Sequence, residues 1–366
     1  MAYNWQHKNW PDFNFDKEKI PRASIQYGIN VGELYGFMEG LDDDSKTELL
    51  LNMLVNEAMK TSELEGEFVN RQEVYSSVQK NLGLKPDVNV SNAKAQGAAE
   101  LVVYLHHNFI KPLSQKELFH WHQILMTGYN NIRIGSWRTK NEPMRVISGR
   151  IGKEVIHFEA PESSRVPEEM KRFINWFNTT APENEMAIDN PIIRAAIAHV
   201  YFETIHPFED GNGRIGRAIS EKALAQHLGR PVFFSLSKSI EKGKQAYYDA
   251  LKQAQSSLDL TQWITYFTNL VIDAQKEAKQ TVLYVVKKGK FYKQFGENLN
   301  ARQKKVVNRM FDAGPSGFEG GMTAKKYISI AKTSKATATR DLQQLVELGA
   351  LKLLGGGRSV SYNINI

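Results

Sequence analysis

Apolar residues recur at helical spacing along most of the chain. In residues 43–60, Leu50, Met53 and Leu54 share one face behind an acidic first turn, which is the pattern of a helix with one buried side. Pro191 stands where the first turn of a helix tolerates a proline. The predicted fold class is therefore mainly α. The same spacing predicts further helices at 92–110, 114–127, 166–179, 190–205, 213–228, 239–254 and 260–288.

Residues 144–160, "MRVISGRIGKEVIHFEA", break this helical pattern. β-Branched residues stand on both sides of "SGRIGK", which predicts a β-hairpin with a glycine-containing turn. An isolated hairpin is marginal in water unless it packs on something or pairs with a strand-like partner. The hairpin is therefore expected to have such a contact.

From about residue 290 the sequence predicts a different order of secondary-structure elements. Three helical segments, "ARQKKVVNRMFDA", "MTAKKYISIAK" and "SKATATRDLQQLVELGAL", precede two short strands around "GGG". This is the order of elements in a winged helix-turn-helix. Such domains bind DNA through the third helix and the wing, and many serve only as protein-interaction modules, so both readings stay open. The residues that would contact DNA are Lys335, Thr337, Thr339 and Arg340 behind a cap at Thr333 or Ser334, with Arg358 at the tip of the wing.

Composition adds little to the choice of function. The 366 residues are 42% hydrophobic, contain no cysteine and carry a net charge of +7, which is ordinary for a globular protein with a proper core. The lack of cysteine excludes disulfides and thiolate metal sites and suits the cytoplasm, where we expect the protein. No signal-like N-terminus and no apolar run long enough to cross a bilayer is visible, so no membrane contact is expected.

The stretch "TIHPFEDGNGRIGR", residues 204–217, concentrates the polar chemistry of the chain. Gly211 and Gly213 permit positive φ, so consecutive backbone N–H groups can point into one concavity at the start of the next helix. A helix N-terminus favours anions. Arg214 and Arg217 lie three apart and project from a similar face. Together these residues have the parts of a polyphosphate cradle.

Two further residues of this stretch suggest a reaction. Asp210 beside phosphate makes sense if a magnesium ion lies between them, because one carboxylate with phosphate oxygens and waters is a usual arrangement for this ion. His206 is suited to accept a proton near neutral pH. Each of these features alone more often has a structural role. Their joint occurrence in the order H-x-F-x-D-G-N-G-R-x-x-R is much more specific for function than a bare G-x-G-x-x-G. The pattern lacks the G-K-[ST] ending of a P-loop.

The string "HPFEDGNGRIGR" resembles the full signature of Fic-domain proteins. The resemblance extends into "NPIIRAAIAHVYFETI" and "GSWRTKNEPMRVISG" and covers roughly residues 100–270. It implies a Fic-type helical core with the hairpin as a flap that aligns a target segment. It also implies magnesium-dependent transfer of AMP from ATP to a Ser, Thr or Tyr hydroxyl of a target protein. In this scheme His206 is the base, Asp210 holds magnesium, Gly211, Asn212, Gly213 and Arg214 hold phosphates, Arg217 meets the γ-phosphate, Phe208 anchors the loop, and Tyr248 and Gln255 contact adenine.

An upstream stretch, "TSELEG" at 61–66, resembles the inhibitory motif [ST]-x-x-x-E-[GN] of the same family. The motif is met by Thr61, Glu65 and Gly66. A carboxylate at Glu65 would form a charge-assisted pair with Arg217 and occupy the arginine that the γ-phosphate needs. The alternative is a glutamate that merely ends a helix. The resemblance favours autoinhibition.

These interpretations divide the chain into an N-terminal helical region with the inhibitory helix (1–90), a Fic catalytic core (91–288) and a winged-helix domain (289–366). The aromatic start, "NWQHKNWPDFNFD", resembles a short domain often fused to bacterial Fic proteins. Expected partners are ATP, a target protein, the chain itself as a target, and DNA through the winged helix, with a homodimer left open. The alternatives are a DNA-binding regulator whose core modifies itself, and a Fic enzyme that uses another nucleotide or removes AMP.

Overall fold

The structure is a computed structural model, and it describes residues 2–20, 23–148, 155–315, 317–356 and 360–365. The chain divides into two compact units. The first unit comprises residues 1–32 and 50–276, and the second comprises residues 33–49 and 277–366. The predicted division at 90 and 288 stays a prediction.

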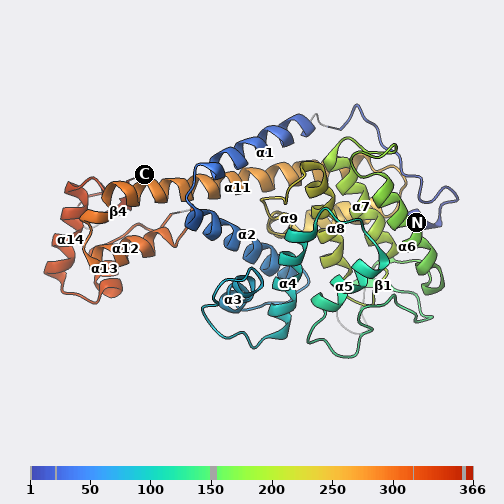
Figure 1. Ribbon diagram of the computed structural model, residues 1–366, viewed down its shortest axis with the longest axis horizontal. Helices are drawn as coiled ribbons and strands as arrows, with labels where there is room; N and C mark the ends of the chain where they lie inside the picture. Colours follow the sequence, from blue (N-terminus) through green and yellow to red (C-terminus); the bar gives the residue numbers. More distant parts are fainter. Residues whose placement is uncertain (1, 21–22, 149–154, 316, 357–359, 366) are drawn as a thin grey trace. The chain divides into compact units, whose positions relative to one another are not determined.

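The secondary structure is mainly helical, as predicted (Figure 1). Among the described residues, no helix is both long and apolar enough to cross a membrane. The helices are α1 (Ala23–Glu39), α2 (Asp43–Leu64), α3 (Arg71–Asn81), α4 (Ala93–Asn108), α5 (Gln115–Leu125), α6 (Val166–Thr179), α7 (Pro191–Ile205), α8 (Asn212–Leu228), α9 (Leu236–Lys242), α10 (Lys244–Ala254), α11 (Thr261–Phe295), α12 (Ala301–Phe311), α13 (Ala324–Ala331) and α14 (Lys335–Glu347). The strands are β1 (Arg145–Ser148), β2 (Val155–Glu159), β3 (Leu351–Leu354) and β4 (Ser361–Ile364).

Two helices were not predicted, and one predicted helix is divided. α1 contains three glycines, Gly28, Gly32 and Gly36, which weaken the helical signal. α3 buries polar residues as well as valines, so it shows no continuous apolar stripe. The helix predicted at 239–254 is interrupted at Gly243, where φ is −128° and ψ is 39°, and becomes α9 and α10.

α7 is the central helix of the first unit. Every residue from Ile192 to Ile205 is buried, as expected of a helix that is covered on all sides. α8 packs along it and α6 on another side (Figure 1). α2 joins α3 and α4 in a second apolar cluster that includes Val55, Ala58 and Val78. α2 thereby brings the segment after residue 60 onto the start of α8.

The predicted hairpin is confirmed. β1 and β2 pair antiparallel, with Arg145 opposite Glu159 and Ser148 opposite Val155, and the register shifts between Val146 and Ile147. The turn predicted at "SGRIGK" lies largely outside the described residues.

The second unit contains α12, α13 and α14 followed by the antiparallel pair β3–β4. Buried Asp341 of α14 joins the three helices, because it accepts from Arg302 Nε at 2.9 Å and from the Tyr327 hydroxyl at 2.9 Å. The elements follow the order expected at 289–366, and the winged-helix assignment stays a prediction. Arg358 lies outside the described residues.

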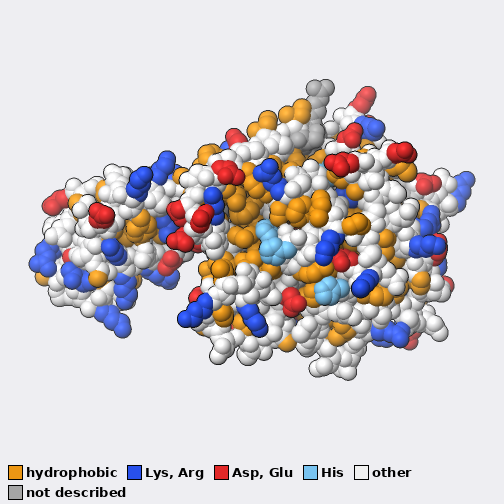
Figure 2. Space-filling view, viewed as in Figure 1, with side chains coloured by type: hydrophobic (Ala, Val, Ile, Leu, Met, Phe, Trp, Pro, Cys, Tyr) orange, Lys and Arg blue, Asp and Glu red, His pale blue; other side chains and the backbone are white. Residues whose placement is uncertain are grey.

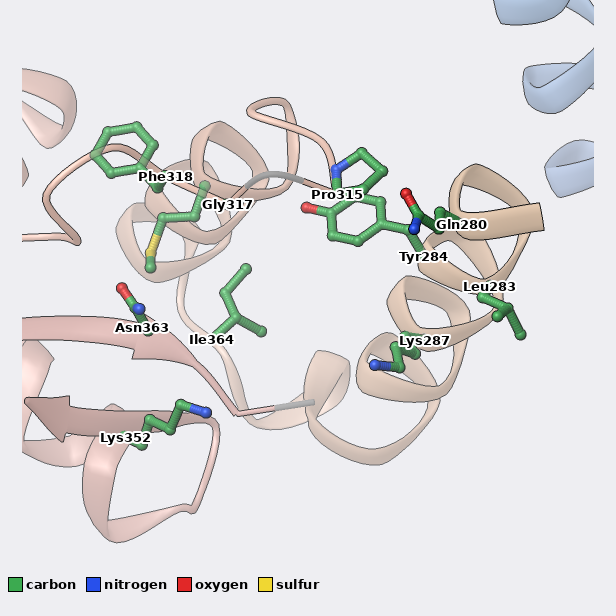
Figure 3. Close-up of a pocket in the computed structure, with 11 residues that line it drawn as sticks. Gln280, Leu283, Tyr284, Lys287, Pro315, Gly317, Phe318, Lys352, Asn363 and Ile364 are labelled. Atoms are coloured by element: carbon green, nitrogen blue, oxygen red, sulfur yellow. The ribbon is translucent and has the colours of Figure 1, made fainter. Parts of the chain in front are cut away.

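A cavity of about 530 Å³ lies within the second unit (Figure 3). Tyr284 and Lys287 line it from α11, Phe318 from the loop before α13, and Lys352 and Ile364 from the two strands. Its lining combines apolar side chains with these two lysines.

Candidate active site

His206 immediately follows the last residue of α7. It has φ 50° and ψ 59°, and this left-handed turn leads the chain into the loop that starts α8. Its Nδ1 lies 3.3 Å from the backbone oxygen of Glu203. The backbone oxygen of His206 accepts from Arg138 Nε at 2.8 Å. Burial, together with the charge of Arg138, lowers the pKa of His206 to about 4. The imidazole is therefore neutral near pH 7 and able to accept a proton.

The loop after His206 is held by an internal frame. Phe208 is buried and its ring stacks on His122, with ring centroids 4.1 Å apart. The Asn212 side chain accepts from Phe208 N at 2.9 Å and donates to Phe208 O at 2.9 Å. The side chain of Asn212 therefore shapes the loop, and only its backbone N–H is available to a phosphate.

The two glycines of the cradle have different roles. Gly211 has φ 81° and is the N-cap of α8, as the sequence predicted. Gly213 was also expected to serve through positive φ, but the structure places it inside the first turn of α8 without positive φ. Its lack of a side chain matters for another reason, because a Cβ there would overlap the carboxylate of Glu65.

Asp210 presents a half-exposed carboxylate at the same helix start. Its Oδ1 accepts from Gly211 N at 2.6 Å and lies 3.6 Å from Arg214 Nη2. In the described part of the chain, no group of three or more His, Cys, Asp or Glu could hold a metal ion. A magnesium ion here would take Asp210 as its protein ligand and share its remaining positions with phosphate oxygens and water.

Arg217 is buried and fully engaged by residues of α2 and the turn that follows it. Its Nε donates to the Thr61 hydroxyl at 2.9 Å, and its Nη2 donates to Thr61 O at 3.0 Å and to Glu65 Oε1 at 2.8 Å. Burial alone would raise the pKa of Glu65, but the charge and hydrogen bond of Arg217 more than offset this and lower it. The structure thus brings the two predicted residues into direct contact as an ion pair.

Arg214 is engaged by a second carboxylate that the sequence did not single out. Arg214 Nη1 donates to Glu67 Oε2 at 2.8 Å and contacts the Tyr129 hydroxyl at 2.8 Å. The Tyr129 hydroxyl also donates to Glu67. Lys94 Nζ donates to the other oxygen of Glu67 at 3.0 Å. Glu67 follows the six-residue motif, so no local pattern marked it.

The two residues predicted to contact adenine lie in different surroundings. The Tyr248 hydroxyl donates to Leu64 O at 3.3 Å, and Lys244 Nζ donates to the same oxygen at 2.7 Å. These two residues of α10 cap the C-terminal end of α2. Gln255 is buried, and its Nε2 donates to Glu203 O at 3.2 Å. Gln255 thus supports the end of α7.

Three further buried residues hold the site together, and sequence reasoning missed them. His122 accepts from Gly135 N at 2.9 Å through Nδ1 and contacts Asp210 O through Nε2 at 3.1 Å. Arg138 donates to backbone oxygens at the end of α7. Glu203 places its carboxylate 3.7 Å from His206 Nδ1. No recognisable sequence motif includes these three residues, so their positions in the sequence did not mark them as part of the site.

Comparisons with known proteins agree with this geometry. Residues 112–224 match the Fic/DOC family, and residues 3–84 match a domain of unknown function, DUF4172. The chain is similar to protein adenylyltransferase fic-1 of Caenorhabditis elegans, with 32% identity over 124 residues, 33% of this chain and 22% of that protein. It is similar to protein adenylyltransferase Fic of Nematostella vectensis, with 32% identity over 111 residues, 30% of this chain and 25% of that protein. The chain spans 36% or less of the length of the curated relatives that it matches.

Solved structures show the same fold. A Fic family protein from Desulfovibrio desulfuricans matches with a TM-score of 0.55 and 20% identity, over 94% of this chain and 96% of that one. A Fic domain containing signaling protein from Bacteroides thetaiotaomicron matches with a TM-score of 0.51 and 18% identity, over 69% of this chain and 96% of that one. Residues 112–224 therefore match the Fic/DOC family, and the chain has the fold of Fic proteins.

Proposed function

We propose that the chain is a protein adenylyltransferase that moves AMP from ATP to a Ser, Thr or Tyr hydroxyl of a target protein. One observation carries the proposal: a neutral imidazole, a half-exposed carboxylate and a helix N-terminus surround one loop at His206, Asp210 and Gly211. This arrangement suits attack of a hydroxyl on a phosphorus atom. The named relatives support the same activity. The cytoplasm, which holds ATP and magnesium, is the proposed place of action.

Each residue has a separate task in the proposed reaction. His206 accepts the proton of the target hydroxyl. The backbone N–H groups at the start of α8 and Arg214 hold phosphate oxygens, and Arg217 holds the γ-phosphate. Asp210 would hold magnesium, which neutralises charge on the phosphates when bound. Positioning and charge stabilisation therefore supply most of the catalysis.

The same proposal includes autoinhibition. Arg217 is occupied by Glu65 and Thr61, so the γ-phosphate of ATP would have to displace a buried, charge-assisted hydrogen bond. Because Gly213 admits the Glu65 carboxylate to the phosphate cradle, the carboxylate also takes space near the nucleotide. Both effects disfavour a productive pose of ATP.

Labelled ATP tests the proposal directly. Glu65→Gly is expected to raise AMP transfer, including self-modification, by roughly tenfold or more, since it removes a charge-assisted hydrogen bond. Glu65→Gly combined with His206→Ala is the matched control and is expected to show no transfer. Equal labelling of the wild type and Glu65→Gly would contradict the inhibitory role. Competition with GTP, UTP and CDP-choline distinguishes ATP from other nucleotides, and release of AMP from labelled protein reports the reverse reaction.

A second candidate function is DNA binding by the second unit. Residues 277–366 contain 16 Lys and Arg against 6 Asp and Glu, a net charge of +10, whereas the whole chain carries +7. Basic side chains are spread over the surface of α12–α14 in Figure 2. Lys335, Thr339 and Arg340 of α14 are exposed. This segregation of charge favours a polyanionic partner, and gel shifts with genomic fragments test it.

A further inference from the structure

Glu203 is a buried carboxyl group for which the proposed AMP transfer has given no task. It lies on α7, one turn before His206, and only 5% of its surface is exposed. Its Oε2 is 3.7 Å from His206 Nδ1. Among the described residues, its Oε1 has no hydrogen-bond partner. Burying such a group is costly, so a packing role alone accounts poorly for it.

The neighbouring helix leaves room for this carboxyl group. Gly216 of α8 faces it, and a Cβ at that position would overlap Glu203 Oε1. Gly216 is helical and has no positive φ, so backbone conformation does not require glycine there. The lack of a side chain at Gly216 therefore serves the placement of Glu203.

The backbone of Glu203 is fixed from outside α7. Gln255 Nε2 donates to Glu203 O at 3.2 Å. Buried Asn4 donates from its backbone N to Gln255 O at 2.8 Å and from its Nδ2 to the Thr204 hydroxyl at 3.0 Å. The N-terminal segment and the end of α10 thus hold the last turn of α7 in place.

The same backbone oxygen faces the imidazole. Glu203 O lies 3.3 Å from His206 Nδ1, and an oxygen acceptor on this side favours the tautomer with the proton on Nδ1. The Nε2 atom is then the unprotonated nitrogen that can accept a proton. Two oxygens of Glu203, its backbone oxygen and its carboxyl Oε2, lie near Nδ1 of His206. Neither is placed beside Nε2.

We propose that Glu203 is a positioning residue for His206, which it holds with Nδ1 protonated and whose positive charge its carboxylate stabilises during the reaction. This inference rests on the proposed function. In the step concerned, the target oxygen bonds to the α-phosphorus of ATP and the bond from that phosphorus to the bridging oxygen breaks. Pyrophosphate leaves, and the hydroxyl proton passes to His206 Nε2. The imidazolium formed is paired with the Glu203 carboxylate.

The contact between Glu65 and Arg217 affects the protonation of Glu203. Burial raises the pKa of Glu203 to about 8, Arg217 opposes this, and the negative charge of Glu65 adds to it. Tyr247 and Tyr248 of α10 are also close enough for the charge of Glu203 to raise their pKa. Departure of Glu65 removes a like charge and favours the ionised form of Glu203. The departure of Glu65 would thus free Arg217 and at the same time favour a negative charge on Glu203.

The test compares variants in the full-length Glu65→Gly background. Glu203→Gln is expected to slow self-labelling at saturating ATP by about tenfold or more, because support for the base is lost. Its ATP dissociation constant, measured by calorimetry, is expected to stay within about twofold, since among the described residues no hydrogen bond or ion pair joins the Glu203 carboxyl group to a phosphate-binding arginine. Glu203→Asp should recover part of the rate. Glu221→Gln changes another buried glutamate, which lies on α8 beside Glu57. It is the matched control and should keep the labelling rate and the ATP affinity of its parent near neutral pH.

The pH profile separates positioning from packing. The carboxyl group of Glu203 stabilises the imidazolium by charge only where it is ionised, and its raised pKa places that ionisation near or above neutral pH. The rate of the parent should therefore rise with pH as Glu203 ionises, and this rise should be absent in Glu203→Gln. Nitrogen-15 NMR of the His206 ring near neutral pH should show the Nδ1-protonated tautomer in the parent and a smaller share of it in the variant. An unchanged rate with an unchanged profile would overturn the inference. So would joint loss of rate and ATP binding with no change in the tautomer of His206.

The NMR measurement also keeps this inference separate from the proposed function. If the Glu65→Gly parent transfers no AMP, the adenylyltransferase proposal fails. The tautomer of His206 in Glu203→Gln still decides whether Glu203 positions the imidazole.

Discussion

At the scale of single residues, the two arginines of the Fic motif are both bound by carboxylates that follow α2. Glu65 is bonded to Arg217 and Glu67 to Arg214, each at 2.8 Å. Burial would raise the pKa of Glu67, but hydrogen bonds from Tyr129 and Lys94 and the charge of Arg214 lower it. Both carboxylates are therefore ionised near neutral pH, and in the proposed function both would compete with phosphate for a guanidinium.

The contact of Glu67 predicts a second contribution to inhibition. Glu67→Gln keeps the size of the side chain and removes its charge, so Arg214 becomes more available to phosphate. We expect ATP to bind roughly threefold to tenfold more tightly, as loss of one charge-assisted hydrogen bond implies. The effect on labelling should be smaller than that of Glu65→Gly, because Arg217 stays occupied.

Calorimetric titration with ATP and magnesium measures this effect. Glu63→Gln is the control, since Glu63 lies in the same segment and pairs with Lys60 instead of a motif arginine. Equal ATP affinity in the two variants would show that Glu67 does not compete with the nucleotide.

At the scale of elements, α2 and α8 meet at a pair of buried carboxyl groups. Glu57 of α2 accepts from the Ser235 hydroxyl at 2.5 Å and from the Ser237 backbone N at 3.3 Å. Burial, then the charge and hydrogen bond of Glu57, raise the pKa of Glu221 of α8 well above its usual value. Glu221 is therefore protonated near neutral pH, and its proton lies between the two carboxyl groups.

The pair predicts how stability depends on pH. The folded state binds the Glu221 proton more tightly than the unfolded state, whose carboxyl pKa is near 4.5. Stability is thus lost as pH rises above that value toward the raised folded pKa. Glu221→Gln should remove this loss, because the amide supplies a donor to Glu57 at every pH.

Thermal unfolding of the wild type and Glu221→Gln between pH 5 and pH 9 tests the predicted direction of this pH dependence. The melting temperature of Glu221→Gln minus that of the wild type should increase with pH, by roughly a few degrees in all. A difference that stays constant across this range would mean that the two carboxyl groups do not share a proton.

At the scale of the whole molecule, charge is divided unequally along the chain. Residues 277–366 carry +10 and the whole chain +7, so residues 1–276 are slightly acidic. Unit charges on an exposed helix contribute to nucleic-acid affinity through release of counterions. The basic surface of the second unit is therefore separate in sequence from the Fic domain at 112–224.

This separation predicts that the two activities can be changed independently. Lys335→Ala combined with Arg340→Ala should weaken binding to duplex DNA and reduce the slope of log affinity against log salt by about two. AMP labelling in the Glu65→Gly background should be unchanged. Fluorescence anisotropy with a labelled duplex at several salt concentrations measures the slope, and an unaltered slope would remove these two residues from the interface.

Much of the fold and of the catalytic loop was predictable because its determinants are local. The apolar spacing of α6 and α7 and the β-branched flanks of the hairpin specify these elements within a few residues. The break at Gly243 was not predictable, since a helix-length apolar pattern runs across it. α1 and α3 were missed because glycines in one and buried polar residues in the other interrupt that pattern.

The sequence by itself determined the order of a histidine, a carboxylate, a glycine-containing helix start and two arginines, because these residues lie in one short stretch and a helix start places them on one side. It also identified Glu65 through its short motif. Only the tertiary structure decided that Glu67 contacts Arg214, from 147 positions away. The same is true of the Glu203 carboxylate beside His206 and the proton shared by Glu57 and Glu221. These contacts depend on how helices pack, and the burial that shifts the pKa of each group exists only once they have packed.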